Sequence, residues 1–168
     1  MENNYAFIDG QNLYLGTQAE NFDLDLARFR IYLKEKYKVS VAYYFLGCIF
    51  DANTELYDEI QKAGFVLKFR EHNSNMIGNK KGNVDTDVVF EMMRSLINEN
   101  QMSKIVLVSG DGDYKKVVDY LIKKDKFLKI LFPNNRYSSL YKEITVKYFD
   151  KLCDEHVRSK IEQKKKRT

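Results

Sequence analysis

The sequence predicts an α/β fold: one domain with a doubly wound, mostly parallel β-sheet flanked by helices. Apolar runs of strand length alternate along the chain with segments whose apolar residues recur at helical spacing, which is the signature of βαβ units. The run Ile105–Val108 is an unbroken block of β-branched and leucine residues, typical of a central strand that is covered on both faces. A chain of 168 residues with 44% hydrophobic content can bury one core without disulfides or a structural metal.

The individual elements follow from the local patterns. We expect strands at residues 5–8, 39–46, 65–69, 105–108 and 127–132, and either an edge strand or the start of a C-terminal helix at 148–152. Helical spacing predicts helices over residues 25–37, 54–63 and 84–97, one that begins near Asp113, and a short one over 138–146. The polar, glycine-containing segment 71–83 is expected to be an exposed loop.

Composition sets the domain boundaries and the kind of partner. We expect one domain over residues 1–152, followed by a basic tail over 153–168, where part of the excess of 28 Lys and Arg over 24 Asp and Glu is found. A basic tail suits a polyanionic partner. No apolar run is long enough to span a membrane, and two widely separated cysteines favour reduced thiols, so we expect a cytoplasmic protein.

Acidic residues follow two of the expected strands and begin one of the helices. Asp9 ends the first strand, Asp111 and Asp113 follow the strand 105–108, and Asp85 and Asp87 lie in the first turn of the helix 84–97. Because the carboxyl ends of parallel strands form the binding crevice of such sheets, these carboxylates are expected to converge. Taken singly, each one is also explained as a helix cap or a favourable partner of the helix dipole.

A convergent group of carboxylates needs a positive charge among them, or some of the carboxyl groups must be protonated. Two carboxylates about 5 Å apart repel by roughly 3 kcal/mol at an effective dielectric constant of about 20. Oxygen ligands without His or Cys suit a hard cation, so the sequence predicts Mg²⁺ or Mn²⁺ rather than Zn²⁺. Such an ion neutralises phosphate charge and activates water, as phosphodiester hydrolysis requires.

Three segments together resemble the NYN-domain family of the PIN-like nuclease superfamily: FIDGQNLY, KGNVDTDVVFEMM and VLVSGDGDYKKVVDYL. The resemblance covers residues 5–152 and implies a PIN-like fold that cleaves RNA with Mg²⁺ or Mn²⁺ and leaves a 5′-phosphate. It implies catalytic roles for Asp9, Asp87, Asp111 and Asp113 and a metal-ligand role for the same residues and Asp85. Asn83 is inserted relative to the commoner KGVD form, so either Asp85 or Asp87 is the inner ligand, and we expect Asp87 to lie closer to the metal.

Four further residues are expected to contact substrate: Asn12, Lys80, Lys81 and Ser109. Asn12 is the amide beside Asp9 in the resemblance, and Lys81 is the basic residue of its KG step. Ser109 at the strand end is placed either to orient a phosphate or a ligand carboxylate, or to hydrogen-bond locally.

The leading hypothesis is a metal-dependent endoribonuclease. The alternative is an RNA-binding module with a residual metal site and no useful turnover. A haloacid-dehalogenase-like phosphatase is disfavoured, because its nucleophile needs a second Asp two residues later, and Asp9 is followed by Gly10 and Gln11. RNA is the expected partner, no membrane association is expected, and a homodimer is left open.

Overall fold

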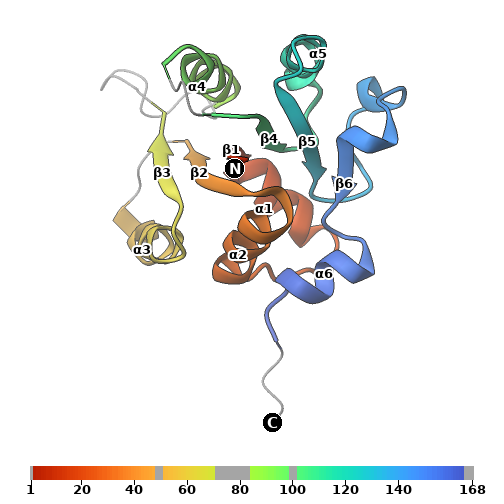
Figure 1. Ribbon diagram of the computed structural model, residues 1–168. Coiled ribbons are helices and arrows are strands. Elements are labelled where there is room, and N and C mark those ends of the chain that lie inside the picture. The colour runs from red at the N-terminus through yellow and green to blue at the C-terminus, as the bar shows by residue number, and fades with distance from the viewer. Residues whose placement is uncertain (1, 48–50, 71–83, 99–101, 165–168) are drawn as a thin grey trace, which may run out of the picture.

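The protein is built on one six-stranded sheet in the order β3-β2-β1-β4-β5-β6, and every neighbouring pair of strands is parallel (Figure 1). The computed structural model describes residues 2–47, 51–70, 84–98 and 102–164. The strands are β1 Asn4–Asp9, β2 Val39–Leu46, β3 Val66–Phe69, β4 Ile105–Val108, β5 Phe127–Phe132 and β6 Phe149–Lys151. The direction of winding reverses between β1 and β4, so the predicted doubly wound α/β fold is confirmed.

Helices cover both faces of the sheet. The described residues form α1 Gly10–Gln18, α2 Leu26–Tyr37, α3 Thr54–Lys62, α4 Asp85–Asn98, α5 Lys115–Lys123 and α6 Glu155–Ile161. Buried residues of α1, α2, α3 and α6 belong to one hydrophobic core, and those of α4 and α5 belong to another. In Figure 1 these two groups of helices lie below and above the strands.

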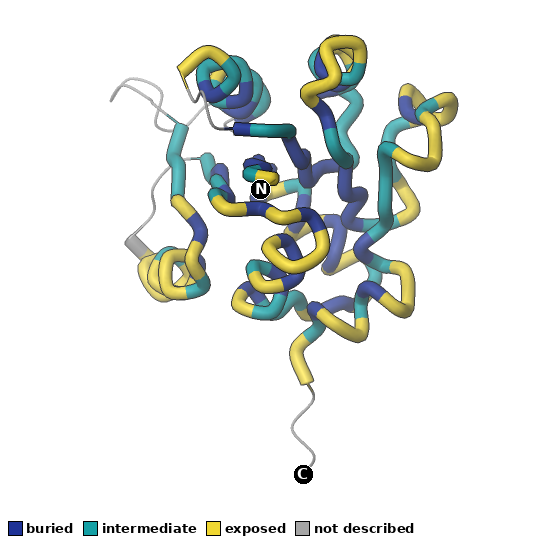
Figure 2. Tube along the Cα trace, viewed as in Figure 1, coloured by how far each residue is buried: buried dark blue, intermediate teal, exposed yellow. Residues whose placement is uncertain are grey.

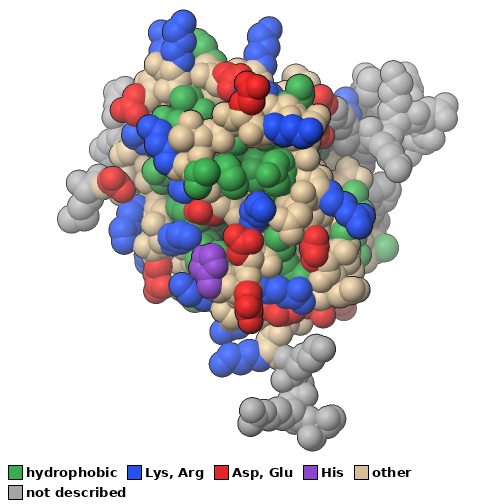
Figure 3. All heavy atoms as spheres, turned by 90° about the vertical axis from the view of Figure 1, so that its right-hand side faces the viewer, with side chains coloured by type: hydrophobic (Ala, Val, Ile, Leu, Met, Phe, Trp, Pro, Cys, Tyr) green, Lys and Arg blue, Asp and Glu red, His purple; other side chains and the backbone are tan. Residues whose placement is uncertain are grey.

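The two cores are separated by the central strands, whose side chains alternate between them. In β1, Ala6 and Ile8 pack on the side of α2, whereas Tyr5 and Phe7 pack on the side of α4. All six residues of β1 are buried, as expected for a strand with a neighbour on each edge and a helical layer on each face. Figure 2 shows the buried strands at the centre and the exposed helix surfaces around them. On the face beside β6, Lys and Arg side chains are interspersed with Asp and Glu around a patch of hydrophobic side chains (Figure 3).

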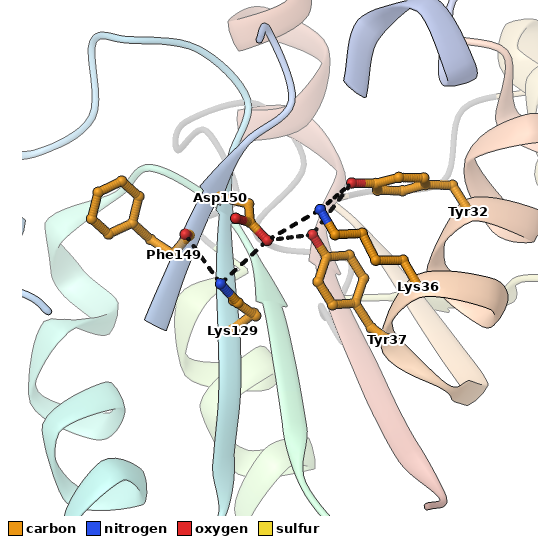
Figure 4. Close-up of polar contacts among 6 residues, drawn as sticks. All are labelled: Tyr32, Lys36, Tyr37, Lys129, Phe149 and Asp150. Carbon is orange, nitrogen blue, oxygen red and sulfur yellow. Dashed lines mark hydrogen bonds and ion pairs between the residues drawn. The ribbon is translucent and has the colours of Figure 1, made fainter. Parts of the chain in front are cut away.

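A network of hydrogen bonds and ion pairs lies beside β6, next to the core that contains α2 (Figure 4). The hydroxyl of Tyr37, at the end of α2, donates to Asp150 Oδ2 over 2.7 Å. The ammonium groups of Lys129 and Lys36 lie 3.4 and 3.6 Å from the same oxygen, and Lys36 also donates to the hydroxyl of Tyr32. The network therefore joins α2 to β5 and β6 through one partly buried carboxylate.

The segment after Leu152 contains a packed helix. Val157 and Ile161 of α6 are fully buried, and the backbone N–H of Asp25 donates to Ile161 O over 2.8 Å. Each buried aliphatic side chain contributes about 1.5–3 kcal/mol, so α6 is part of the folded domain. The expected boundary at residue 152 therefore falls before the last packed element.

Other local predictions differ in detail from the structure. The expected helix at 138–146 consists of two 3₁₀ turns, Ser139–Tyr141 and Val146–Tyr148, whereas β6 confirms the edge strand. The helix α1 was not predicted. The expected loop at 71–83 lies outside the described residues. In the described part of the chain, no helix combines the length and the apolar character that crossing a membrane requires.

Candidate metal centre

The candidate site lies where the winding of the sheet reverses, at the carboxyl ends of β1 and β4. These strands are hydrogen-bonded neighbours, and Ile8 pairs with Val108. The chain then continues into α1 from β1, and into a 3₁₀ turn, Gly112–Tyr114, from β4. The first turn of α4 packs against that 3₁₀ turn. Three segments far apart in the sequence therefore meet at the edge where open α/β sheets bind ligands.

Three carboxylates converge at this edge. One oxygen from each of Asp85, Asp111 and Asp113 lies within 4.8 Å of the other two. Asp85 and Asp111 are half-buried and Asp113 is exposed. At such distances each pair of charges repels by roughly 3 kcal/mol at an effective dielectric constant of about 20, and by less where water screens Asp113.

The chemistry of this donor set fits a hard divalent cation. All three donors are carboxylate oxygens, and no His or Cys belongs to the group among the described residues. Mg²⁺ is held in proteins by one or two carboxylates together with waters and substrate phosphates, and Mn²⁺ has similar preferences. Asp85, Asp111 and Asp113 are therefore suited to hold such an ion and leave it open to a phosphate.

Asp9 lies beside this group but is more deeply buried, with 4% of its surface exposed. Its Oδ1 accepts the backbone N–H of Asn12 over 3.1 Å, so Asp9 also caps α1. Burial raises the pKa of Asp9 above 3.8, the hydrogen bonds from Asn12 and Tyr114 oppose this, and the charges of Asp85 and Asp111 raise the pKa further. Asp9 therefore holds a proton to higher pH than an exposed aspartate does.

Tyr114 connects Asp9 to the three-carboxylate group. Its hydroxyl lies 3.1 Å from Asp9 Oδ2 and 2.8 Å from Asp85 Oδ1. A phenol has one proton to donate, so the second contact is a hydrogen bond only when a carboxyl carries a proton. Burial and the two carboxylates raise the pKa of Tyr114 far above its usual value, so the phenol stays neutral.

The loop that carries Asp111 is fixed by hydrogen bonds from several directions. The Asp111 N–H donates to Ser109 Oγ over 3.1 Å, and its carbonyl accepts the hydroxyl of Tyr141 over 2.7 Å. Asp111 Oδ1 accepts the N–H of Asp113 over 3.0 Å. A Cβ at Gly112 would lie 2.5 Å from Ser138 Oγ, so the turn needs glycine at this position. These contacts fix the backbone of the loop and the Asp111 carboxylate.

The structure distinguishes the two acidic residues of α4. Asp85 joins the group with Asp111 and Asp113, whereas Asp87 does not. Residues two positions apart are rotated by about 200° around the helix axis, so their side chains lie on nearly opposite sides and cannot both face one ion. The expectation that Asp87 lies closer to the metal than Asp85 is not supported by this arrangement. Asp87 is half-buried, and its Oδ2 has no hydrogen-bond partner among the described residues.

The residues expected to contact substrate have different positions. Ser109 is completely buried and its Oγ accepts the Asp111 N–H, so it helps to position the loop. Asn12 Oδ1 accepts the N–H of Gly110 over 2.8 Å and links α1 to the same loop. Lys80 and Lys81 lie outside the described residues.

Sequence reasoning missed Tyr114 and Tyr141 as site residues. Tyr114 ends the SGDGDY motif and is spaced as a core residue of the following helix, and Tyr141 has the same appearance in a segment expected to be helical. Both rings are buried in the core beneath α5. Only the structure shows that their hydroxyls reach Asp9, Asp85 and the carbonyl of Asp111.

Comparisons with known proteins agree with this fold. A family model described as NYN domain matches residues 5–157. The low amplitude and bright protein LabA of Synechococcus elongatus is 25% identical over 166 residues, which cover 94% of this chain and 86% of LabA. The crystal structure of a protein of unknown function from Vibrio parahaemolyticus, VPA0982, shares the fold with a TM-score of 0.74 at 18% identity, over 91% of this chain and 94% of that one. Because the family model spans most of the sequence, the protein belongs to the NYN-domain family of the PIN-like nuclease superfamily.

Proposed function

We propose that this protein is a metal-dependent endoribonuclease. The observation that carries the proposal is the convergence of Asp85, Asp111 and Asp113 beside the buried Asp9, at the switch point of the sheet. Membership in a nuclease-like family supports hydrolysis of a nucleic acid, and the motif resemblance favours RNA. Mg²⁺ or Mn²⁺ is the cofactor that the oxygen donors suit.

Each residue has a distinct part in the proposed reaction. A divalent ion bound by Asp85, Asp111 and Asp113 would supply charge neutralisation for the phosphodiester and a lowered pKa for water. Tyr114 holds the Asp85 carboxylate in place through a 2.8 Å hydrogen bond and contacts Asp9 from the same hydroxyl. Asp9 is buried beside these carboxylates, and burial raises its pKa, so it holds a proton more readily than an exposed aspartate does.

The test uses purified protein and a labelled single-stranded RNA of mixed sequence. Cleavage is measured with Mn²⁺, with Mg²⁺ and with EDTA for the wild type, Asp111→Asn and Asp125→Asn. Asp125 is the matched control. It is exposed, pairs with Lys104, and lies just before β5, at the amino ends of the strands and away from the carboxylate group. Its φ of 55° is a backbone conformation that Asn also tolerates.

We expect cleavage by the wild type and Asp125→Asn with either metal, none with EDTA, and none by Asp111→Asn. Cleavage that persists in EDTA, or in Asp111→Asn, would overturn the proposal. Metal-dependent RNA binding by the wild type without any product would instead favour the RNA-binding module. The cytoplasmic location remains a prediction from the sequence, which leaves the question of a homodimer open.

A further inference from the structure

A small pocket lies next to the candidate metal centre, between α1 and the segment that follows β5. It has a volume of about 180 Å³ and is lined by Asn12, Leu15, Gly110, Pro133 and Arg136, among others. All three of its segments follow the carboxyl ends of adjacent strands, β1, β4 and β5. The pocket is therefore on the same edge of the sheet as the three carboxylates.

The pocket and the metal centre share a wall. The backbone N–H of Asn12 donates to Asp9, and its side-chain oxygen accepts the N–H of Gly110, which immediately precedes Asp111. Asn12 thus contacts the Asp9 carboxylate and lines the pocket, and Gly110 lines the pocket directly before Asp111 in the chain. The pocket therefore borders the loop that carries Asp111.

Hydrogen bonds and a close backbone contact hold the pocket in shape. Asn134 Nδ2 donates to Gly16 O over 3.1 Å, and Asn134 Oδ1 accepts the N–H of Arg136 over 2.8 Å. A Cβ at Gly16 would lie 2.5 Å from the Cβ of Pro133, so α1 and the 133–136 segment approach each other only because residue 16 is glycine. The walls are fixed by these contacts between two segments that are distant in sequence.

The lining combines a cation, an amide and apolar surface. Arg136 is exposed, and within the described ranges no carboxylate forms an ion pair with it. Asn12 uses only its side-chain oxygen in the described contacts, so its amide hydrogens are available as donors. Leu15 is 58% exposed and Pro133 is buried, and both offer apolar surface. An exposed arginine with no carboxylate partner among the described residues suits a ligand that carries its own negative charge, such as a phosphodiester.

We propose that this pocket binds the nucleotide next to the scissile bond of the RNA, an inference that rests on the proposed function. Arg136 pairs with the phosphate of that nucleotide, the Asn12 amide donates to an oxygen of its sugar or base, and Leu15 and Pro133 pack against the sugar or the base face. The volume suits one part of a nucleotide, since pockets for whole drug-sized ligands have about 300–1,000 Å³. The pocket thereby sets the register of the strand relative to the metal.

The test compares Arg136→Gln with Lys123→Gln. Lys123 is an exposed residue at the end of α5, near the opposite edge of the sheet, and its replacement changes the net charge by the same amount. Binding of a labelled single-stranded oligoribonucleotide is measured by fluorescence anisotropy over a series of salt concentrations, in the Asp111→Asn background so that no cleavage interferes. Cleavage kinetics are measured separately in the otherwise wild-type protein.

We expect Arg136→Gln to weaken RNA binding about tenfold, the value of one charge-assisted hydrogen bond. The slope of log affinity against log salt should fall by roughly 0.7, as for one lost phosphate contact on a single strand. In cleavage, KM should rise about tenfold while kcat stays within about twofold, because Arg136 touches no reacting atom. Lys123→Gln should behave as the parent protein in each assay.

Unchanged affinity and salt slope in Arg136→Gln would overturn the pocket proposal and leave the nuclease proposal standing. Equal losses in Arg136→Gln and Lys123→Gln would also overturn it, because binding would then depend only on net charge. Absence of cleavage in the wild type would refute the nuclease, whereas the binding comparison would still decide whether Arg136 contacts RNA.

Discussion

The hydroxyl of Tyr114 is the most informative single group to remove, because it touches two carboxylates and is shielded from water. Tyr114→Phe deletes one oxygen and keeps the ring, which is 0% exposed. The oxygen lies 2.8 Å from Asp85 Oδ1 and 3.1 Å from Asp9 Oδ2. Hydrogen bonds to charged groups contribute about 1.5–3 kcal/mol, and water cannot easily replace the lost donor at Asp9. We therefore expect the metal-free protein to lose about 2 kcal/mol of unfolding free energy at pH 7.

The loss should depend on pH in a direction set by Asp9. Its pKa is raised above 3.8 in the folded protein, mainly by burial, so ionised Asp9 lowers stability above the folded pKa. This cost disappears as the pH falls toward 3.8 and the carboxyl is protonated. Removing the hydroxyl of Tyr114 takes away a hydrogen bond that favours the ionised form of Asp9, so the pKa of Asp9 should rise further. The destabilisation caused by Tyr114→Phe should therefore be largest near neutral pH and smaller near pH 4.5.

Urea unfolding in EDTA at pH 7 and at pH 4.5 measures both effects. With a slope of about 2 kcal/mol per molar urea, a loss of about 2 kcal/mol lowers the midpoint by about 1 M at pH 7. Tyr120→Phe is the matched control, because Tyr120 is 46% exposed on α5, and its change should stay within about 0.5 kcal/mol. Equal stability of Tyr114→Phe and wild type at pH 7, or an equal loss at both pH values, would refute this reasoning.

Three other perturbations test separate parts of the structure. Millimolar Mn²⁺ or Mg²⁺ should raise the melting temperature of the wild type more than that of Asp85→Asn, because an ion bound only by the folded state stabilises it by an amount that grows with its affinity. Scanning calorimetry measures this, and an equal rise in both proteins would contradict it. Asp9→Asn should make the metal-free protein more stable than wild type at pH 7, because it removes a buried carboxylate whose pKa is raised by burial. Lower stability of the variant in chemical unfolding would show that the hydrogen bond that caps α1 contributes more. Asp150→Ala should lower the free energy of unfolding in urea by about 1–3 kcal/mol, because Lys129 and the hydroxyl of Tyr37 lose their shared acceptor. A loss below about 0.5 kcal/mol would mean that the network contributes little to stability.

The sheet could be predicted because its strands differ clearly from the rest of the chain. The runs at β1, β4 and β5 are mostly apolar, with aromatic, leucine and β-branched residues, and the helical spacing between them leaves parallel pairing as the simplest arrangement. The helix α1 was missed because Gly10, Gln11, Asn12 and Gly16 look like loop residues. They form a helix because Asp9 caps it and Leu13 packs into the core, and because Gly10 and Gly16 allow contacts with β2 and Pro133 that a side chain would block.

The acidic residues of the site could be predicted from the sequence, but their positions relative to one another could not. The positions of Asp9, Asp111 and Asp113 at strand ends follow from topology alone. The choice between Asp85 and Asp87 depends on how α4 is rotated about its axis against the 3₁₀ turn, which its apolar pattern does not fix to within 100°. The roles of Tyr114 and Ser109 depend on where buried hydroxyls point, and their spacing gives only the signal of core residues.

Direct measurement of metal binding tests the central claim, that Asp85, Asp111 and Asp113 hold a divalent ion. Electron paramagnetic resonance can follow the signal of unbound Mn²⁺ during titration of wild type, Asp85→Asn and Asp87→Asn in the absence of RNA. We expect saturable binding by the wild type and Asp87→Asn, and an affinity lower by about tenfold or more in Asp85→Asn, because one carboxylate ligand has lost its charge. Wild-type binding that is absent, or that is weakened by Asp87→Asn and left intact by Asp85→Asn, would contradict the assignment of this metal centre.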